Sequence, residues 1–94
     1  MESFSCAIKG SVLVLNGKVN VDSLGKIMKN DAFNVSETIS DIDCANITHA
    51  DSSCLAFLLY LQEKYQSVAF VNLPKHLLLL VDLYDLDNTL NLRR

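Results

Sequence analysis

With 94 residues, the chain has room for one domain with a small core, and we expect residues 1–94 to fold as a single unit. The net charge of −3 and the scattered lysines leave no basic stripe for a phosphate backbone, so nucleic-acid binding is not expected. Half of the residues are hydrophobic and 20% are charged, a surplus of apolar side chains that so small a domain has difficulty burying. Part of this surplus is expected at the surface as a binding patch.

The apolar runs are too short to cross a membrane. The two longest, residues 55–61 and 77–81, fall far below the roughly 18–20 residues that a transmembrane helix needs. The first ten residues, MESFSCAIKG, have no basic start followed by an apolar stretch, so no secretory signal is expected. These features predict a cytoplasmic protein without a membrane span of its own.

Two short segments at the start of the chain predict a β-hairpin. Residues 4–8 alternate between apolar and polar types, and Gly10-Ser11 is a turn signal. Residues 12–15 are a run of Val and Leu, and Asn16-Gly17 is expected to end the second strand.

A helix, a strand and a polar turn are predicted next. Residues 21–33 place apolar side chains at helical spacing behind Asp22 or Ser23 as the N-cap. Residues 37–43 alternate weakly, and their position between two helices favours a strand. Residues 48–53, THADSS, follow as a polar elbow.

Two leucine-rich helices are predicted in the second half of the chain. Residues 55–66 are apolar on more than one face, so this helix is either wedged in the core or meets a partner on its outer side. Residues 67–72 predict a buried strand, and Pro74, suited to the first helical position, opens a last helix with two apolar faces. The tail, residues 87–94, is compatible with an edge strand or a loose turn.

The order of the predicted elements defines the fold class. Two strands are followed by helix, strand, helix, strand and helix, an order that implies parallel crossovers. Right-handed crossovers place successive helices on the same side of a sheet. The sequence therefore predicts a small α/β fold with a mixed β-sheet and helices packed mainly on one face.

The three cysteines, Cys6, Cys44 and Cys54, form no CxxC pair, and no histidine is spaced with them as a ligand. Neither a disulfide framework nor a zinc site is expected, and no other metal or cofactor is predicted. Cys54 is predicted in the first turn of a helix, where the helix dipole favours a thiolate. No neighbouring base is apparent in the sequence, so a reactive role for this thiol is disfavoured.

The elbow leads into a helix N-terminus, where free N–H groups and the helix dipole favour an anion or an accepting side chain. In the simplest interpretation, Asp51 or Ser52 is the N-cap. Alternatively, Ser52 or Ser53 is a contact or phosphorylation point. A nucleophilic serine with His49 as base is disfavoured, because the chain has no GxSxG motif and no glycine-rich oxyanion loop. No enzymatic activity is expected.

The elbow and its flanking segments resemble the STAS domain family, whose usual elbow is a hydrophobic strand ending in D-[ST]-[SG]-G-L. The likeness covers essentially the whole chain. The matching residues are Ile42-Asp43, Ile47, ADSSCLAFLL at 50–59, a strand at Val68 and LYDL at 83–86. Within the family, the apolar helix and the L-Y-x-L ending are most similar to MlaB-type subunits. Cys54 departs from the family pattern, which has Gly there, and Ser53 departs from the Gly that MlaB-type elbows tend to have.

The resemblance implies a non-catalytic cytoplasmic subunit of the Mla phospholipid-transport ABC complex, which maintains outer-membrane lipid asymmetry in Gram-negative bacteria. Its implied partner is an MlaF-like ABC ATPase in a membrane complex with a permease. Ser52 takes the place of the family's elbow Thr or Ser at the ATPase contact. A homodimer of the isolated chain stays an open alternative. The predicted partner-binding residues are Asp51, Ser52, Ser53, Phe57, Tyr60 and Tyr84.

A second branch of the same family supplies the alternative function. In anti-sigma-factor antagonists, the phosphorylated serine corresponds to Ser53, and the DSS triplet resembles that branch locally. The alternative is therefore a partner-switching regulator that a kinase-type anti-sigma factor phosphorylates on Ser52 or Ser53. The helices and the chain length look more like the MlaB type.

Overall fold

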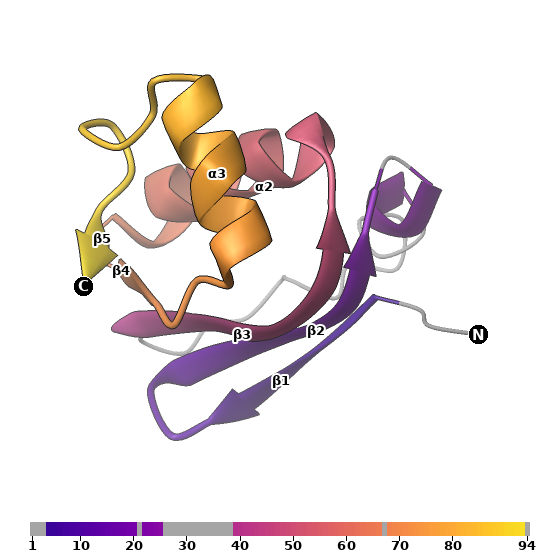
Figure 1. Cartoon of the computed structure of the whole chain (residues 1–94). Coiled ribbons are helices and arrows are strands. Elements are labelled where there is room, and N and C mark those ends of the chain that lie inside the picture. Colours follow the sequence, from indigo (N-terminus) through magenta and orange to yellow (C-terminus); the bar gives the residue numbers. More distant parts are fainter. Residues whose placement is uncertain (1–3, 21, 26–38, 67, 94) are drawn as a thin grey trace.

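The structure is an α/β layer in which helices cover one face of a mixed β-sheet (Figure 1). The computed structural model describes residues 4–20, 22–25, 39–66 and 68–93. Its named elements are β1 (Ser5–Lys9), β2 (Val12–Val19), β3 (Asp41–Ala50), α2 (Ser52–Tyr65), β4 (Ala69–Val71), α3 (Lys75–Leu83) and β5 (Leu92–Arg93). The strands lie in the order β1-β2-β3-β4-β5, and among these pairs only β1 and β2 are antiparallel. The predicted α/β fold class is confirmed.

β1 and β2 form the hairpin predicted at the start of the chain, with Gly10 at φ 64 in the turn. The prediction that the second strand ends at Asn16-Gly17 is wrong, because β2 continues to Val19 alongside β3. Gly17 adopts φ 98, a conformation that favours glycine, next to a shift in the β2–β3 register. The glycine therefore accommodates an irregularity inside the strand instead of ending it.

β3 is the central strand. Its register with β2 shifts along the strand, so its buried residues do not follow a simple alternating pattern. One residue of β3 is extra between Asp43 and Asn46, relative to the paired segment of β2. A bulge of this kind bends a strand and moves its inward-facing positions by one residue. Cys44 and Ile47, which are three residues apart, are therefore both buried.

The ends of β3 also differ from the prediction. The strand starts at Asp41 rather than at residue 37, and residues 37–38 lie outside the described part of the chain. It runs on to Ala50, so residues 48–49 belong to the strand and not to a polar elbow. Pairing with β2 explains this length, because the last residue of β2 is paired with Ala50. The turn between β3 and α2 is thus reduced to Asp51.

The second half of the sheet is built from two parallel crossovers. β4 and β5 each add in parallel beside the preceding strand, with α2 and α3 as the connections. Right-handed crossovers in one direction place both helices on one face of the sheet, as Figure 1 shows. Within the predicted range 67–72 the strand is Ala69–Val71, and residue 67 lies outside the described part of the chain. Pro74 is the N-cap of α3 rather than its first residue.

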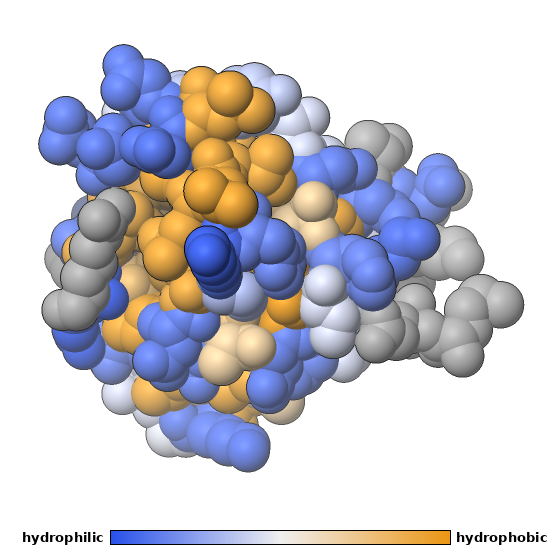
Figure 2. Space-filling view, viewed as in Figure 1, coloured by the Kyte–Doolittle hydropathy of each residue, from blue (hydrophilic) through white to orange (hydrophobic). Residues whose placement is uncertain are grey.

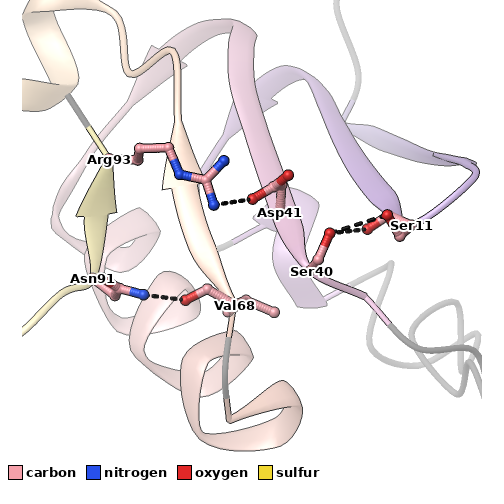
Figure 3. Close-up of polar contacts among 6 residues, drawn as sticks. All are labelled: Ser11, Ser40, Asp41, Val68, Asn91 and Arg93. Atoms are coloured by element: carbon pink, nitrogen blue, oxygen red, sulfur yellow. Dashed lines mark hydrogen bonds and ion pairs between the residues drawn. The ribbon is translucent and has the colours of Figure 1, made fainter.

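The tail forms a short edge strand, one of the two alternatives that the sequence leaves open. Figure 3 shows how its neighbourhood is tied to the rest of the sheet. Arg93 Nη2 lies 2.8 Å from Asp41 Oδ1 and so links β5 to β3 across β4. The side-chain amide of Asn91 donates to the Val68 carbonyl at 2.8 Å, and its backbone N–H donates to Gln62 Oε1 at 2.7 Å. The end of the chain is thereby fastened to both α2 and the sheet.

The first predicted helix is described only at its beginning, where residues 22–25 are helical. Ser23 N donates to Asn20 Oδ1 at 2.9 Å, and Asn20 N donates back to Ser23 Oγ at 2.9 Å. This reciprocal pair makes Asn20 the N-cap, so the prediction of Asp22 or Ser23 at that position is wrong. The remainder of the predicted helix, residues 26–33, lies outside the described part.

The core lies between the sheet and the two helices. Its completely buried large side chains include Leu13, Leu15, Ile42, Leu58, Leu61, Phe70 and Leu77, each with 0% exposure. α2 begins at Ser52 rather than at residue 55, and its buried residues are Cys54, Leu55, Phe57, Leu58 and Leu61. At about 100° per residue they cover one broad face, nearly half of the helix circumference. The core therefore covers most of the apolar residues of α2, whereas Tyr60 stays 39% exposed.

Candidate functional site

The N-terminus of α2 is closed by Asp51. This residue has an extended backbone, with φ −123 and ψ −169, and its Oδ1 accepts a hydrogen bond from Ser53 N at 2.9 Å. The Ser53 hydroxyl donates to the same carboxylate oxygen, and Cys54 N donates to the Asp51 carbonyl at 3.0 Å. Asp51 is thus the N-cap, which decides between the two candidates that the sequence leaves open.

The two serines of the elbow differ in their surroundings. The Ser53 hydroxyl is engaged by Asp51, and the residue is half-buried. Ser52 is exposed, and within the described residues its hydroxyl makes no hydrogen bond. A hydroxyl has one donor and two acceptor positions. Ser52 therefore presents its full hydrogen-bonding capacity to the surface, whereas Ser53 is used inside the cap.

A row of exposed residues continues from Ser52 along α2. Ser52, Ala56, Tyr60 and Glu63 are spaced by four, four and three residues, so they share one side of the helix, and all four are exposed. We call this row the α2 outer stripe. Tyr60 is 39% exposed, and Lys64 Nζ lies 5.9 Å from the centre of its ring. The stripe therefore combines a free hydroxyl, a small residue and a half-exposed aromatic ring.

Phe57 is a core residue rather than a surface anchor. It is 4% exposed, and its ring meets that of Phe4 edge-on, with the ring centres 5.6 Å apart. On its other side it stacks against Tyr60 at 6.3 Å. The prediction that Phe57 contacts a partner is therefore corrected, because the folded domain already covers this ring. The buried Phe57 ring thus packs against Tyr60.

The exposed apolar surplus lies mainly on α3. Leu79 is 60% exposed and Leu83 is 75% exposed, one helical turn apart, and we call this pair the α3 ridge. Figure 2 shows apolar surface gathered over this helix. Tyr84 follows as the C-cap and is 52% exposed, although the sequence pattern places it on the same face as buried Leu77. Within the described residues, no hydrogen bond or ring contact joins Tyr84 to the elbow.

The hydrogen bonds found for the polar side chains near the elbow join residues close together in the sequence. His49 Nδ1 lies 3.3 Å from Thr48 Oγ1, and the Asp51 carboxylate accepts from Ser53 as a helix cap does. Among the described residues, no three His, Cys, Asp or Glu side chains are grouped so that they could hold a metal ion.

Among the helices of the described residues, none has the length and apolar character to span a membrane.

The cysteine thiols are free, and two of them are enclosed by the core. Cys44 and Cys54 are both 0% exposed. Burial, with a smaller contribution from the Asp51 charge, raises the pKa of Cys54 to about 12. Burial also raises the pKa of Cys44. At Cys54, the desolvation that opposes a thiolate therefore outweighs the helix dipole, which favours one.

Replacing Asp51 with alanine is expected to lower the free energy of unfolding by about 1 kcal/mol, because the Ser53 N–H loses its acceptor. The matched variant Asp51→Asn keeps an accepting oxygen and is expected to lose no more than a few tenths of a kcal/mol. Urea unfolding followed by circular dichroism measures both. Equal losses in the two variants would contradict the assignment of Asp51 as a hydrogen-bonding cap.

Comparisons with known proteins identify no family for this chain. No protein-family model matches the chain, and no curated protein matches it significantly. The likeness to the STAS domain described above is therefore used only as the basis of a proposal.

Proposed function

We propose that this chain is a non-catalytic STAS-type subunit of the MlaB kind, which binds an MlaF-like ABC ATPase through the α2 outer stripe. The observation that supports the proposal most directly is the exposed Ser52 hydroxyl, free of hydrogen bonds in the described residues, at the first turn of α2. It occupies the position that the resemblance assigns to the ATPase contact. The Asp51 cap fixes the turn around it.

The geometry of the stripe suits a protein contact. Because the cap already orders the turn, little conformational freedom is lost when a partner hydrogen-bonds to Ser52. Ala56 allows the partner backbone to approach closely, and Tyr60 offers an aromatic ring with a polar tip, a residue type that often dominates binding energy. Phe57 stacks beneath Tyr60 and holds that ring in place.

In this proposal the subunit acts from the cytoplasmic side, on an ATPase that is itself bound to a permease. It supports assembly and activity of the ATPase, and so the phospholipid transport that keeps the outer membrane of Gram-negative bacteria asymmetric. The sequence holds no GxxxxGK[ST] motif, so ATP is assigned to the partner. In this proposal the contacts on α2 are Ser52 and Tyr60, with Asp51 and Ser53 as the cap that positions Ser52. Tyr84, which is 52% exposed, stays a predicted contact outside the α2 outer stripe.

Replacing Ser52 with arginine is expected to weaken binding to the MlaF-type ATPase of the same organism by about tenfold or more, since a bulky charge enters the contact. Isothermal titration calorimetry with the purified ATPase measures the change. Ser5→Arg is the matched control, because Ser5 is also exposed but lies on β1. Both variants should keep the wild-type circular dichroism spectrum. Unchanged affinity of the Ser52 variant would remove the elbow from the contact.

The alternative function, an anti-sigma-factor antagonist, is favoured by the same exposed hydroxyl. A phosphate on Ser52 lies at the positive end of the α2 dipole, whereas Ser53 is a poorer acceptor because its hydroxyl is engaged by Asp51. Purification of the tagged chain from its native host separates the two functions. Recovery of an ABC ATPase with an unmodified elbow supports the first, and recovery of a kinase-type anti-sigma factor without an ATPase supports the second.

A further inference from the structure

The charges on α3 run against the helix dipole. Lys75 stands in its first turn, next to His76, and Asp82 in its last, with no acidic residue in the first turn and no basic one in the last. Positive charge near a helix N-terminus and negative charge near its C-terminus are both unfavourable in an isolated helix. All three residues are exposed, and within the described residues neither Lys75 nor Asp82 forms an ion pair. Nothing in this part of the fold therefore compensates these charges.

These charges flank the α3 ridge in a regular way. Lys75, Leu79 and Asp82 are spaced by four and three residues, so they lie on one side of α3, with Leu83 one turn beyond Leu79. The basic end, the apolar middle and the acidic end follow one another along the helix. A partner helix that complements this surface must place an acid near Lys75, an apolar residue near Leu79 and a base near Asp82.

We propose that the α3 ridge binds α3 of a second copy of this chain, with the two helices antiparallel about a two-fold axis near Leu79. In this arrangement Lys75 of each copy faces Asp82 of the other, and Leu79 packs against its own counterpart. Each charge also moves next to the end of the other helix whose dipole favours it. The same surface thus supplies both halves of a complementary pair.

A parallel arrangement of the two helices is disfavoured by the same charges. It places Lys75 against Lys75 and Asp82 against Asp82, and like charges directly opposite each other are repulsive. The register is therefore decided by charge, whereas the ridge leucines supply the apolar contact.

The size of the surface sets the expected affinity. A contact through the face of one nine-residue helix stays below the roughly 1,000 Å² that stable interfaces exceed, so a weak dimer with a Kd of roughly 10 µM to 1 mM is expected. The dimer contact lies on α3, whereas the proposed ATPase contact lies on α2. Self-association therefore does not depend on the proposed function.

Sedimentation equilibrium of the full chain, from about 10 µM to 1 mM, tests the proposal over the expected affinity range. The wild type should show a monomer–dimer equilibrium. Lys75→Glu and Asp82→Lys should each weaken dimerisation by about tenfold or more, because each creates two like-charge pairs per dimer. The double variant carrying both changes should recover an affinity within about threefold of wild type, because the opposite charges face each other again. All three variants change exposed residues and should keep the wild-type circular dichroism spectrum.

Three results would overturn the proposal. They are a chain that stays monomeric over the whole concentration range, single reversals that leave the equilibrium unchanged, and a double variant that does not recover. Ser52→Arg should dimerise as the wild type does, so failure of the ATPase contact and failure of the α3 dimer are separate outcomes.

Discussion

Replacing Leu58 with alanine is expected to lower the free energy of unfolding by about 2–5 kcal/mol. Leu58 has 0% exposure and belongs to the cluster of buried side chains between α2 and the sheet. The truncation loses the transfer free energy of the buried carbons and leaves a cavity that close-packed neighbours fill only in part. Urea unfolding followed by circular dichroism measures the difference in free energy.

The matched control is Leu83→Ala, which makes the same chemical change on α3 at a residue that is 75% exposed. It is expected to change the free energy of unfolding by no more than about 0.5 kcal/mol at a concentration where the chain is monomeric. A loss of similar size at both positions would contradict the finding that Leu58 is buried and Leu83 is exposed.

The element order could be predicted from the sequence because local signals were strong. Gly10-Ser11 marks the hairpin turn, and the Val and Leu run after it suits a strand. The leucine-rich segments after residues 52 and 74 are long enough to be helices. Once strands and helices alternate, the handedness of crossovers places both helices on one face.

The centre of the sheet was harder to predict, for a physical reason. β3 is bulged, so its inward-facing residues do not follow a period of two. Cys44 and Ile47, for example, are both buried although they are three residues apart. The alternating pattern therefore ends too early in the sequence. The polar residues Thr48 and His49 look like a loop, although pairing with β2 keeps them in the strand.

The start of α2 could be predicted from the sequence, but the burial of its aromatic side chains could not. Asp51, Ser52 and Ser53 do form the start of α2, because a cap has a recognisable sequence. Which aromatic residues are exposed depends on contacts far away along the chain. Phe57 is covered by Phe4, which is far from it in the sequence, and helical periodicity carries no information about such a neighbour.

Replacing Phe57 with alanine is expected to lower the free energy of unfolding by about 3–5 kcal/mol. The ring is 4% exposed and contacts both Phe4 and Tyr60, so its removal leaves a cavity and takes away two aromatic contacts. Thermal unfolding by calorimetry measures the loss. Any loss of ATPase binding in this variant should follow from unfolding or from a displaced Tyr60.

Tyr60→Ala, in contrast to Phe57→Ala, should weaken ATPase binding while changing the stability of the fold only a little. Tyr60 is 39% exposed, so its removal is expected to cost about 1 kcal/mol of stability. In the proposed complex its ring becomes buried against the ATPase, and its loss should weaken binding by about fivefold or more. If Phe57→Ala left stability unchanged while abolishing binding by a folded protein, Phe57 would be the anchor after all. If Tyr60→Ala left the affinity unchanged, the contact would not extend along the α2 outer stripe as far as Tyr60.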